Sequence, residues 1–368
     1  MFTLSLCMIV KNENDVIKRC LDCVKNIVDE IIIVDTGSTD NTKEIALKYT
    51  DKVYSFKWIN DFSAARNFSF SKATKDYIMW LDADDIITPE NQKALKQLKK
   101  TMNPSVDVVM MKYNVAFDEN DNPTFSYYRE RILKRTMNFK WVSEIHEVIP
   151  TSGYIIHSPI AISHKKIHPN EPQRNLKIFE QILADGKTLD PRQKYYYGRE
   201  LYYNAKYEQS IAQFLNFLEE GNGWIENNIS ACRDLAACYY TIGKDTDAIN
   251  ALFKTFLYDT PRAEVCCDIG KHFLDRQQYK IAIFWYETAR NQPINQESGA
   301  FITLDSYGFI PDIQICLCYD RLGDYKNAFK YNELAGKIKP NDPKYLYNKE
   351  YFERMHADVL NFDCKSNS

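Results

Sequence analysis

The N-terminal 165 residues alternate short, continuously apolar runs with longer amphipathic segments. Short apolar runs bounded by polar residues are typical of strands buried on both faces of a sheet. The segments between them repeat apolar residues at helical spacing. We predict strands over 3–10, 30–35, 52–56, 77–85 and 107–117, and helices over 14–27, 38–50, 62–73 and 89–100. This order predicts an α/β domain with a mostly parallel sheet, covered on both faces, whose ligands bind at the carboxyl ends of the strands.

After about residue 172 the strand pattern stops and helical segments recur. Four small residues come into register at intervals of 38, 34 and 46 residues, and four more lie twelve positions before them. The two sets are Ser210, Ala248, Ala282 and Ala328, and Gly198, Ala236, Gly270 and Cys316. This spacing resembles the tetratricopeptide repeat, in which small residues lie where paired helices cross closely. The alternative is an irregular helical bundle. We expect an α/β domain over 1–168 and an all-α repeat domain over 169–368, with the proline-containing segment 166–174 between them.

Composition excludes several classes of protein. The net charge is -3 with 26% charged residues, so there is no basic excess of the kind that nucleic-acid binding requires. No run of eighteen apolar residues occurs, and the N-terminal apolar run lacks a basic leader, so we expect neither a membrane span nor a signal peptide. The ten cysteines are scattered, with Cys20 and Cys23 as one CxxC pair. We interpret them as reduced thiols of a cytoplasmic protein.

The segment "YIMWLDADD" (77–85) leads from apolar residues directly into three carboxylates. Only Gly37 and Gly153 occur before residue 170, which excludes the glycine-rich loops that usually bind dinucleotides or phosphates. Asp82 and Asp84 alternate on a strand, and Mg²⁺ or Mn²⁺ is commonly held by one or two carboxylates together with phosphate oxygens. The alternative is that Asp84 and Asp85 cap the helix that follows Pro89.

Four segments in order, "SLCMIVKNE" from residue 5, "VDEIIIVDTGSTDNT" at 28–42, "FSAARNFSF" at 62–70 and "WLDADD" at 80–85, resemble a family 2 glycosyltransferase with the GT-A fold. The resemblance is specific over the first 90 residues and weaker from there to about residue 165. The helical half resembles the tetratricopeptide extension that some members of the family carry. The expected cofactors are therefore Mn²⁺ or Mg²⁺ and a nucleotide-sugar donor, with a UDP-sugar as the first choice.

The resemblance also implies roles for individual residues. The nucleotide-binding residues would be Val10, Lys11, Glu13, Asp35, Gly37, Ser38, Arg66 and Asp82. In this assignment Asp35 accepts a hydrogen bond from the base, Arg66 faces the diphosphate, and Asp82 meets ribose or metal. Asp84 meets the metal itself. Taken singly, Asp35 could simply begin a turn, and Arg66 or Lys11 could be solvated surface charges.

Sugar transfer also needs a general base, and "FKWVSEIHEVIP" (139–150) is the candidate segment. We predict Glu147 as the base, with His146 as its rival or as a substrate contact. The alternative for this pair is a structural ion pair with Arg129, Arg131 or Lys140. The segment "PIAISHKKIH" (159–168) ends a further predicted strand at His164. By analogy with other GT-A enzymes, His164 would supply a further metal or phosphate contact.

The leading hypothesis is an inverting, metal-dependent glycosyltransferase that acts on Ser, Thr or Cys of a peptide or protein, held by the helical repeats. One alternative changes the acceptor to a cell-envelope glycan or a lipid-linked sugar. The other is a non-catalytic tetratricopeptide adaptor with a vestigial sheet domain. Exposed ends of repeat arrays can pair, so a homodimer is compatible with the sequence.

Overall fold

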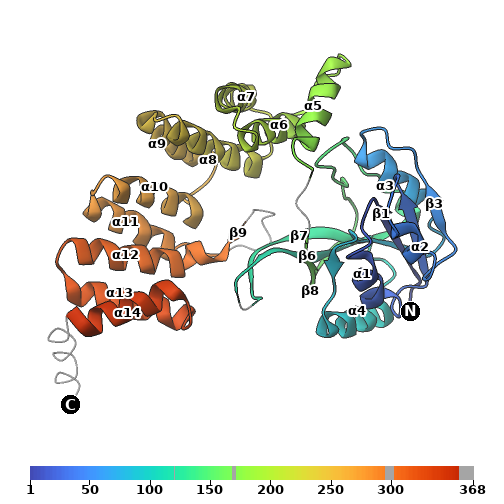
Figure 1. Cartoon of the computed structure of the whole chain (residues 1–368), viewed down its shortest axis with the longest axis horizontal. Coiled ribbons are helices and arrows are strands. Elements are labelled where there is room, and N and C mark those ends of the chain that lie inside the picture. The colour runs from blue at the N-terminus through green and yellow to red at the C-terminus, as the bar shows by residue number, and fades with distance from the viewer. Residues whose placement is uncertain (120, 168–170, 295–301, 356–368) are drawn as a thin grey trace. The chain divides into compact units, whose positions relative to one another are not determined.

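The computed structural model describes residues 1–119, 121–167, 171–294 and 302–355. The chain forms two compact units, Met1–Glu200 and Leu201–Ser368. Figure 1 shows strands and helices together in the first unit, and helices with the short strand β9 (Ile302–Thr303) in the second. The predicted boundary at residues 168 and 169 lies outside the described residues.

The N-terminal unit is built on one mixed sheet with the strand order β3-β2-β1-β4-β7-β6-β8-β5. The bounds of these strands are β1 Leu4–Val10, β2 Glu30–Asp35, β3 Val53–Ser55, β4 Tyr77–Trp80, β5 Asp85–Ile86, β6 Val108–Phe117, β7 Pro123–Lys134 and β8 Ile155–His164. Strand β1 pairs in parallel with β2 and β4, and β2 pairs in parallel with β3. The carboxyl ends of these four strands therefore meet at one edge of the sheet, as predicted from the sequence.

Strand β7 was not predicted from the sequence. It lies antiparallel to both β4 and β6, as the second half of a long hairpin. Strand β8 is parallel to β6, and the short β5 pairs antiparallel with the end of β8. The last pairing places Asp85 opposite His164. The sheet thus brings the acidic segment after β4 next to the end of β8.

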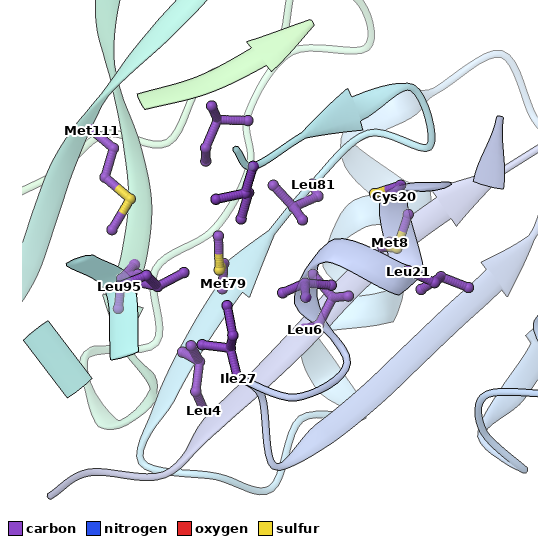
Figure 2. Packing of buried hydrophobic residues seen from close by; sticks show 14 of the residues in the cluster. Leu4, Leu6, Met8, Cys20, Leu21, Ile27, Met79, Leu81, Leu95 and Met111 are labelled. Atoms are coloured by element: carbon purple, nitrogen blue, oxygen red, sulfur yellow. The ribbon is translucent and has the colours of Figure 1, made fainter. Parts of the chain in front are cut away.

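Helices cover both faces of the sheet, as expected. The bounds are α1 Ile17–Val24, α2 Thr42–Ala46, α3 Phe62–Ser71 and α4 Pro89–Thr101, followed by α5 Arg174–Ala184 and α6 Pro191–Tyr203, with a 3-10 turn at Arg135–Met137. Helices α1 and α4 pack on one face, where Figure 2 shows Leu6 and Met8 of β1 with Cys20 and Leu21 of α1. The opposite face carries Phe70 of α3. Helix α4 begins at Pro89 with Thr88 as its N-cap, which contradicts the alternative that Asp84 or Asp85 caps it.

The second unit consists of antiparallel helix pairs, which confirms the predicted repeat architecture. The bounds are α7 Tyr207–Glu220, α8 Ile225–Thr241, α9 Asp245–Lys254, α10 Ala263–Asp275, α11 Tyr279–Arg290, α12 Phe309–Arg321, α13 Tyr325–Ile338 and α14 Pro343–Met355, with 3-10 turns at Thr255–Leu257 and Leu304–Tyr307 and a short strand β9 at Ile302–Thr303. The aligned residues Ser210, Ala248, Ala282 and Ala328 are each 0% exposed. Small side chains there let the paired helices approach closely.

Two further expectations concern the whole chain. Within the described ranges, no helix combines the length and apolar character needed to cross a lipid bilayer. The nine cysteines in these ranges are free thiols, and all except Cys23 are buried. Cys364 lies outside the described residues.

Candidate active site

The ends of β1 and β2 form the first part of the site. Val10 and Asp35 are register partners, so the segments that follow both strands lie side by side. Asp35 Oδ1 accepts hydrogen bonds from the Ser38 backbone N–H at 2.9 Å and from the Ser38 hydroxyl at 2.7 Å. Gly37 has φ of +109°, a backbone conformation that suits glycine. Asp35 therefore organises the turn through one oxygen, in agreement with the turn-forming alternative for this residue.

The segment after β1 is tied to the same turn. The Asn12 side-chain oxygen accepts from the Thr39 backbone N–H at 2.8 Å, and the Asn12 N–H donates to the Ser38 hydroxyl at 3.0 Å. The Glu13 N–H donates to Thr42 Oγ1 at 2.7 Å. Lys11, which lies between the end of β1 and Asn12, is exposed. Two strand ends thus make one bonded surface, which includes the residues predicted to hold the base and ribose.

The carboxylate turn, residues 82–85, follows β4. Its three acids have different surroundings. Asp85 is 0% exposed, and its oxygens accept from the backbone N–H of Asp82, the hydroxyl of Tyr113 and the guanidinium of Arg131. Asp82 and Asp84 are only partly covered, with side-chain exposures of 30% and 15%. Asp85 therefore shapes the turn from within, while Asp82 and Asp84 remain accessible to a ligand.

His164 faces this turn from the end of β8. Its Nδ1 lies 3.1 Å from Asp84 Oδ1, 3.4 Å from Asp85 Oδ1 and 2.9 Å from the Tyr113 hydroxyl. Burial opposes a charge on the ring, but the hydrogen bonds with Asp84 and Asp85 raise the pKa of His164 to about 10. Arg19 of α1 donates to the backbone carbonyls of Asp84 and Lys165, which joins the turn to the end of β8.

Arg66 of α3 joins the carboxylate turn to the predicted base. Its Nη2 donates to Asp82 Oδ1 at 2.8 Å, and its Nε donates to Glu147 Oε1 at 2.7 Å. Burial works against the guanidinium charge, yet Asp82 and Glu147 raise the pKa of Arg66 further above its ordinary value. Burial likewise opposes ionisation of Asp82, but the charges of Arg66 and Arg131 lower its pKa. Glu147 forms its ion pair with Arg66, and this was not among the three partners considered from the sequence.

Two indole rings and three arginine side chains pack together next to these contacts. The rings of Trp80 and Trp141 meet edge to face at a centroid distance of 4.8 Å. Three guanidinium groups lie over the Trp80 ring, those of Arg66 at 5.3 Å, Arg129 at 4.9 Å and Arg131 at 3.7 Å. Such contacts are favourable when the cation is desolvated. They fix the direction of Arg66 toward Asp82 and Glu147.

His146 points elsewhere. Its Nε2 lies 2.9 Å from Glu200 Oε1 of α6, and its ring stacks on Tyr196 with a centroid distance of 4.1 Å. The structure therefore brings Asp82, Asp84, His164, Arg66 and Glu147 into one bonded cluster and directs His146 to another set of partners.

The cluster fits a hard divalent cation. Asp82, Asp85 and His164 each offer a ligand atom, and these atoms lie within 4.8 Å of one another. Because both oxygens of Asp85 already accept internal hydrogen bonds, Asp84 is the better second carboxylate. Carboxylate oxygens match the ligand preferences of Mn²⁺ and Mg²⁺. His164 would add a ligand only after its ring loses the proton that Asp84 and Asp85 stabilise.

Comparison with known proteins agrees with this geometry. Residues 5–161 match the description "Glycosyl transferase family 2". The N-terminal domain is a family 2 glycosyltransferase domain. With the helical repeats that follow it, this confirms the fold class predicted from the sequence.

The chain also resembles two curated proteins over part of their length. It is 35% identical over 153 residues to a TPR repeat-containing protein of Synechococcus elongatus, which covers 41% of this chain and 36% of that protein. It is 29% identical over 222 residues to the SPbeta prophage-derived glycosyltransferase SunS of Bacillus subtilis, which covers 57% of this chain and 51% of SunS. The chain thus spans between about a third and a half of these relatives.

A solved structure that holds both a metal and a donor also matches part of the chain. The crystal structure of glucosyl-3-phosphoglycerate synthase from Mycobacterium tuberculosis, in complex with Mn²⁺, UDP-glucose and phosphoglyceric acid, is 23% identical and covers 30% of this chain and 44% of that chain. The TM-score is 0.27, at which the two structures share too little for an inference from one to the other.

Several residues of the site could not be singled out from the sequence. Arg131 and Tyr113 hold Asp85, Arg19 binds the turn, and Glu200 binds His146. The available signal was in "YYRERI" (127–132), where Arg129 and Arg131 alternate on a strand and so point to one face. Two cations on one face of a strand with aromatic and aliphatic neighbours are compatible with buried partners.

Proposed function

We propose that the protein is an inverting, metal-dependent glycosyltransferase that moves a sugar from a nucleotide-diphosphate sugar to a peptide or protein. The observation that carries the proposal is the cluster in which Arg66 joins Asp82 to Glu147 beside Asp84 and His164. It lies at the carboxyl edge of the sheet of a family 2 domain.

The donor end of the site follows from the strand ends. The base and ribose would lie over the turn at 35–38 and the segment 10–13, and the diphosphate would lie toward Arg66 and Asp82. Asp84, Asp82 and His164 would hold Mn²⁺ or Mg²⁺, which would offset the negative charge of the departing diphosphate. A guanidinium next to that position adds a second positive charge.

The transfer step is a single displacement. The acceptor oxygen or sulfur attacks the anomeric carbon of the sugar, and its proton passes to the Glu147 carboxylate. The bond between the anomeric carbon and the diphosphate oxygen breaks, and its electron pair leaves with the nucleoside diphosphate. Arg66 holds Glu147 at Oε1 with a bond of 2.7 Å and orients the carboxylate. A Cys acceptor needs less help from the base than a hydroxyl, because its ordinary pKa is about 8.5.

The acceptor class rests on the helical repeats, since concave repeat surfaces bind extended segments of proteins. A cytoplasmic location and pairing of two chains stay predictions. A glycan or lipid-linked acceptor would be revealed if sugar were transferred to such a molecule and never to a polypeptide.

A screen of nucleotide sugars with purified protein tests the proposal. We expect binding and slow hydrolysis of one donor, UDP-glucose being the first to try, only with Mn²⁺ or Mg²⁺ present. Asp84→Ala should abolish the metal-dependent binding, whereas Asp51→Ala, at an exposed site, should not. Glu147→Gln should lower kcat about 100-fold or more with little change in donor affinity. Absence of donor binding in the presence of metal would favour the adaptor alternative.

A further inference from the structure

The base loop, residues 139–150, contains little regular structure of its own. One isolated bridge joins Val142 to Val148. Helix α6 and the segment before it provide anchors for the loop: Glu144 accepts from Lys187 at 2.9 Å and from Gln193 at 3.0 Å. These partners lie beyond residue 168, yet they belong to the same compact unit as the sheet. The loop that carries Glu147 is therefore held from the side of α5 and α6.

His146 lies at the centre of this anchor, the set of contacts that attaches the base loop to α5 and α6. Its φ is +52°, in the left-handed region, where a residue other than glycine persists only if its surroundings impose it. The ring is nearly parallel to Tyr196, at 11°, and to Phe179 of α5, at 20°. Glu200 Oε1 lies 2.9 Å from His146 Nε2 and also accepts from Asn175 at 3.0 Å. Stacking and a hydrogen bond together fix both the ring and the backbone at this position.

The consequence for Glu147 is geometric. Adjacent residues in the loop face different partners: His146 is bound by Glu200, while Glu147 is bound by Arg66 at 2.7 Å. Arg192 Nε donates to the His146 carbonyl at 3.2 Å, immediately before the peptide bond to Glu147. The position of the Glu147 backbone is thus set by contacts with α6, and the direction of its carboxylate is set by Arg66.

We infer that His146 and Glu200 are positioning residues, and that α5 and α6 complete the active site by fixing the loop that carries the base Glu147. This inference rests on the proposed function. His146 acts through the backbone of its neighbour and does not take the acceptor proton. A displacement of about 1 Å at the reacting groups costs up to roughly 100-fold in rate, so loss of the anchor is expected to reduce kcat. Donor binding, which uses the strand ends, is expected to remain.

Three variants separate this role from that of a base. Glu200→Ala removes the partner of His146, Glu200→Gln keeps an acceptor for the ring N–H, and His146→Asn keeps a residue that tolerates the left-handed backbone. Glu208→Gln, at an exposed position on α7, is the control. The measurements are the affinity for UDP-glucose with Mn²⁺, the rate of its hydrolysis, transfer to a synthetic peptide with Ser, Thr and Cys, and the pH–rate profile.

We expect kcat to fall about 10- to 100-fold in Glu200→Ala and His146→Asn, and by less than about threefold in Glu200→Gln, with donor affinity unchanged. The pH–rate profile should keep its wild-type shape in all three, because no group that contacts the Glu147 carboxylate is altered. The groups that face Glu147 electrostatically, Arg66, Arg129 and Arg174, are unaltered. A shifted acid limb in Glu200→Gln would make His146 the base and overturn the inference, as would wild-type rates in Glu200→Ala. An inactive wild type would instead argue against the proposed function.

Discussion

Replacement of Arg131 by methionine removes the cation that faces the buried carboxylate of Asp85. Both side chains are 0% exposed. Arg131 donates at 3.1 Å to Asp85 and at 3.1 Å to the Trp80 carbonyl, and its guanidinium lies 4.2 Å from the Tyr113 ring. Methionine fills a similar volume, so the loss is mainly electrostatic. Removing one partner of a buried ion pair costs about 3–5 kcal/mol, a large share of the roughly 5–15 kcal/mol that stabilises an ordinary domain.

Hydrogen exchange of backbone amides is the suitable assay, because a chain of two units does not unfold in one step. Amides of the pair Met79 and Ile132, which are register partners on β4 and β7, should lose about two to four powers of ten in protection. Arg135→Met, at an exposed site on the same chain segment, should change protection little. The double variant Arg131→Met with Asp85→Asn should recover part of the loss. Wild-type protection in Arg131→Met would refute the reasoning.

Two further predictions concern stability in each unit. Burial opposes ionisation of Glu30, but hydrogen bonds, led by that from Lys52, lower its pKa from 4.5 to about 2. The ionised Glu30 therefore adds to the free energy of unfolding above about pH 4.5, and this contribution is lost as the pH falls toward 2. In urea titrations at several pH values, Glu30→Gln should make the free energy of unfolding of the N-terminal unit depend less on pH on the acid side. Gly270→Ala would place a Cβ 2.9 Å from the buried Tyr286 ring. We expect this substitution to destabilise the helical unit by about 1–3 kcal/mol, measured by thermal unfolding. An unchanged Tm would show that the ring can move.

The strands and helices that position the donor end of the site could be predicted because their signals are local. The pattern of β1, β2 and β4 is continuous and apolar, so these strands and their common edge followed from periodicity alone. The hairpin partner β7 was missed because its sequence, "PTFSYYRERILK", carries charges that are usual on a surface. Arg131 is buried here only because Trp80 and Asp85 come from distant segments to meet it.

The role of the segment after residue 168 could not be predicted for a similar reason. The prolines at 169 and 172 indicate a change of domain, and the helical pattern then continues without interruption. Glu200 and Gln193 look like ordinary polar residues of a surface helix. Their contacts with His146 and Glu144 depend on how α6 returns to the sheet, which no local pattern encodes.

The chain order of the carboxylate turn and its cationic partners has a consequence for synthesis on the ribosome. Asp82, Asp84 and Asp85 emerge well before Arg131 and His164, which come from β7 and β8. Until those strands are made, a nascent chain carries the acidic segment with Arg19 and Arg66 but without Arg131 and His164, and it carries β4 without its neighbour β7. The central part of the sheet cannot form before most of the N-terminal unit has left the ribosomal exit tunnel. A stalled or shortened translation product is therefore expected to need a chaperone rather than to fold in stages.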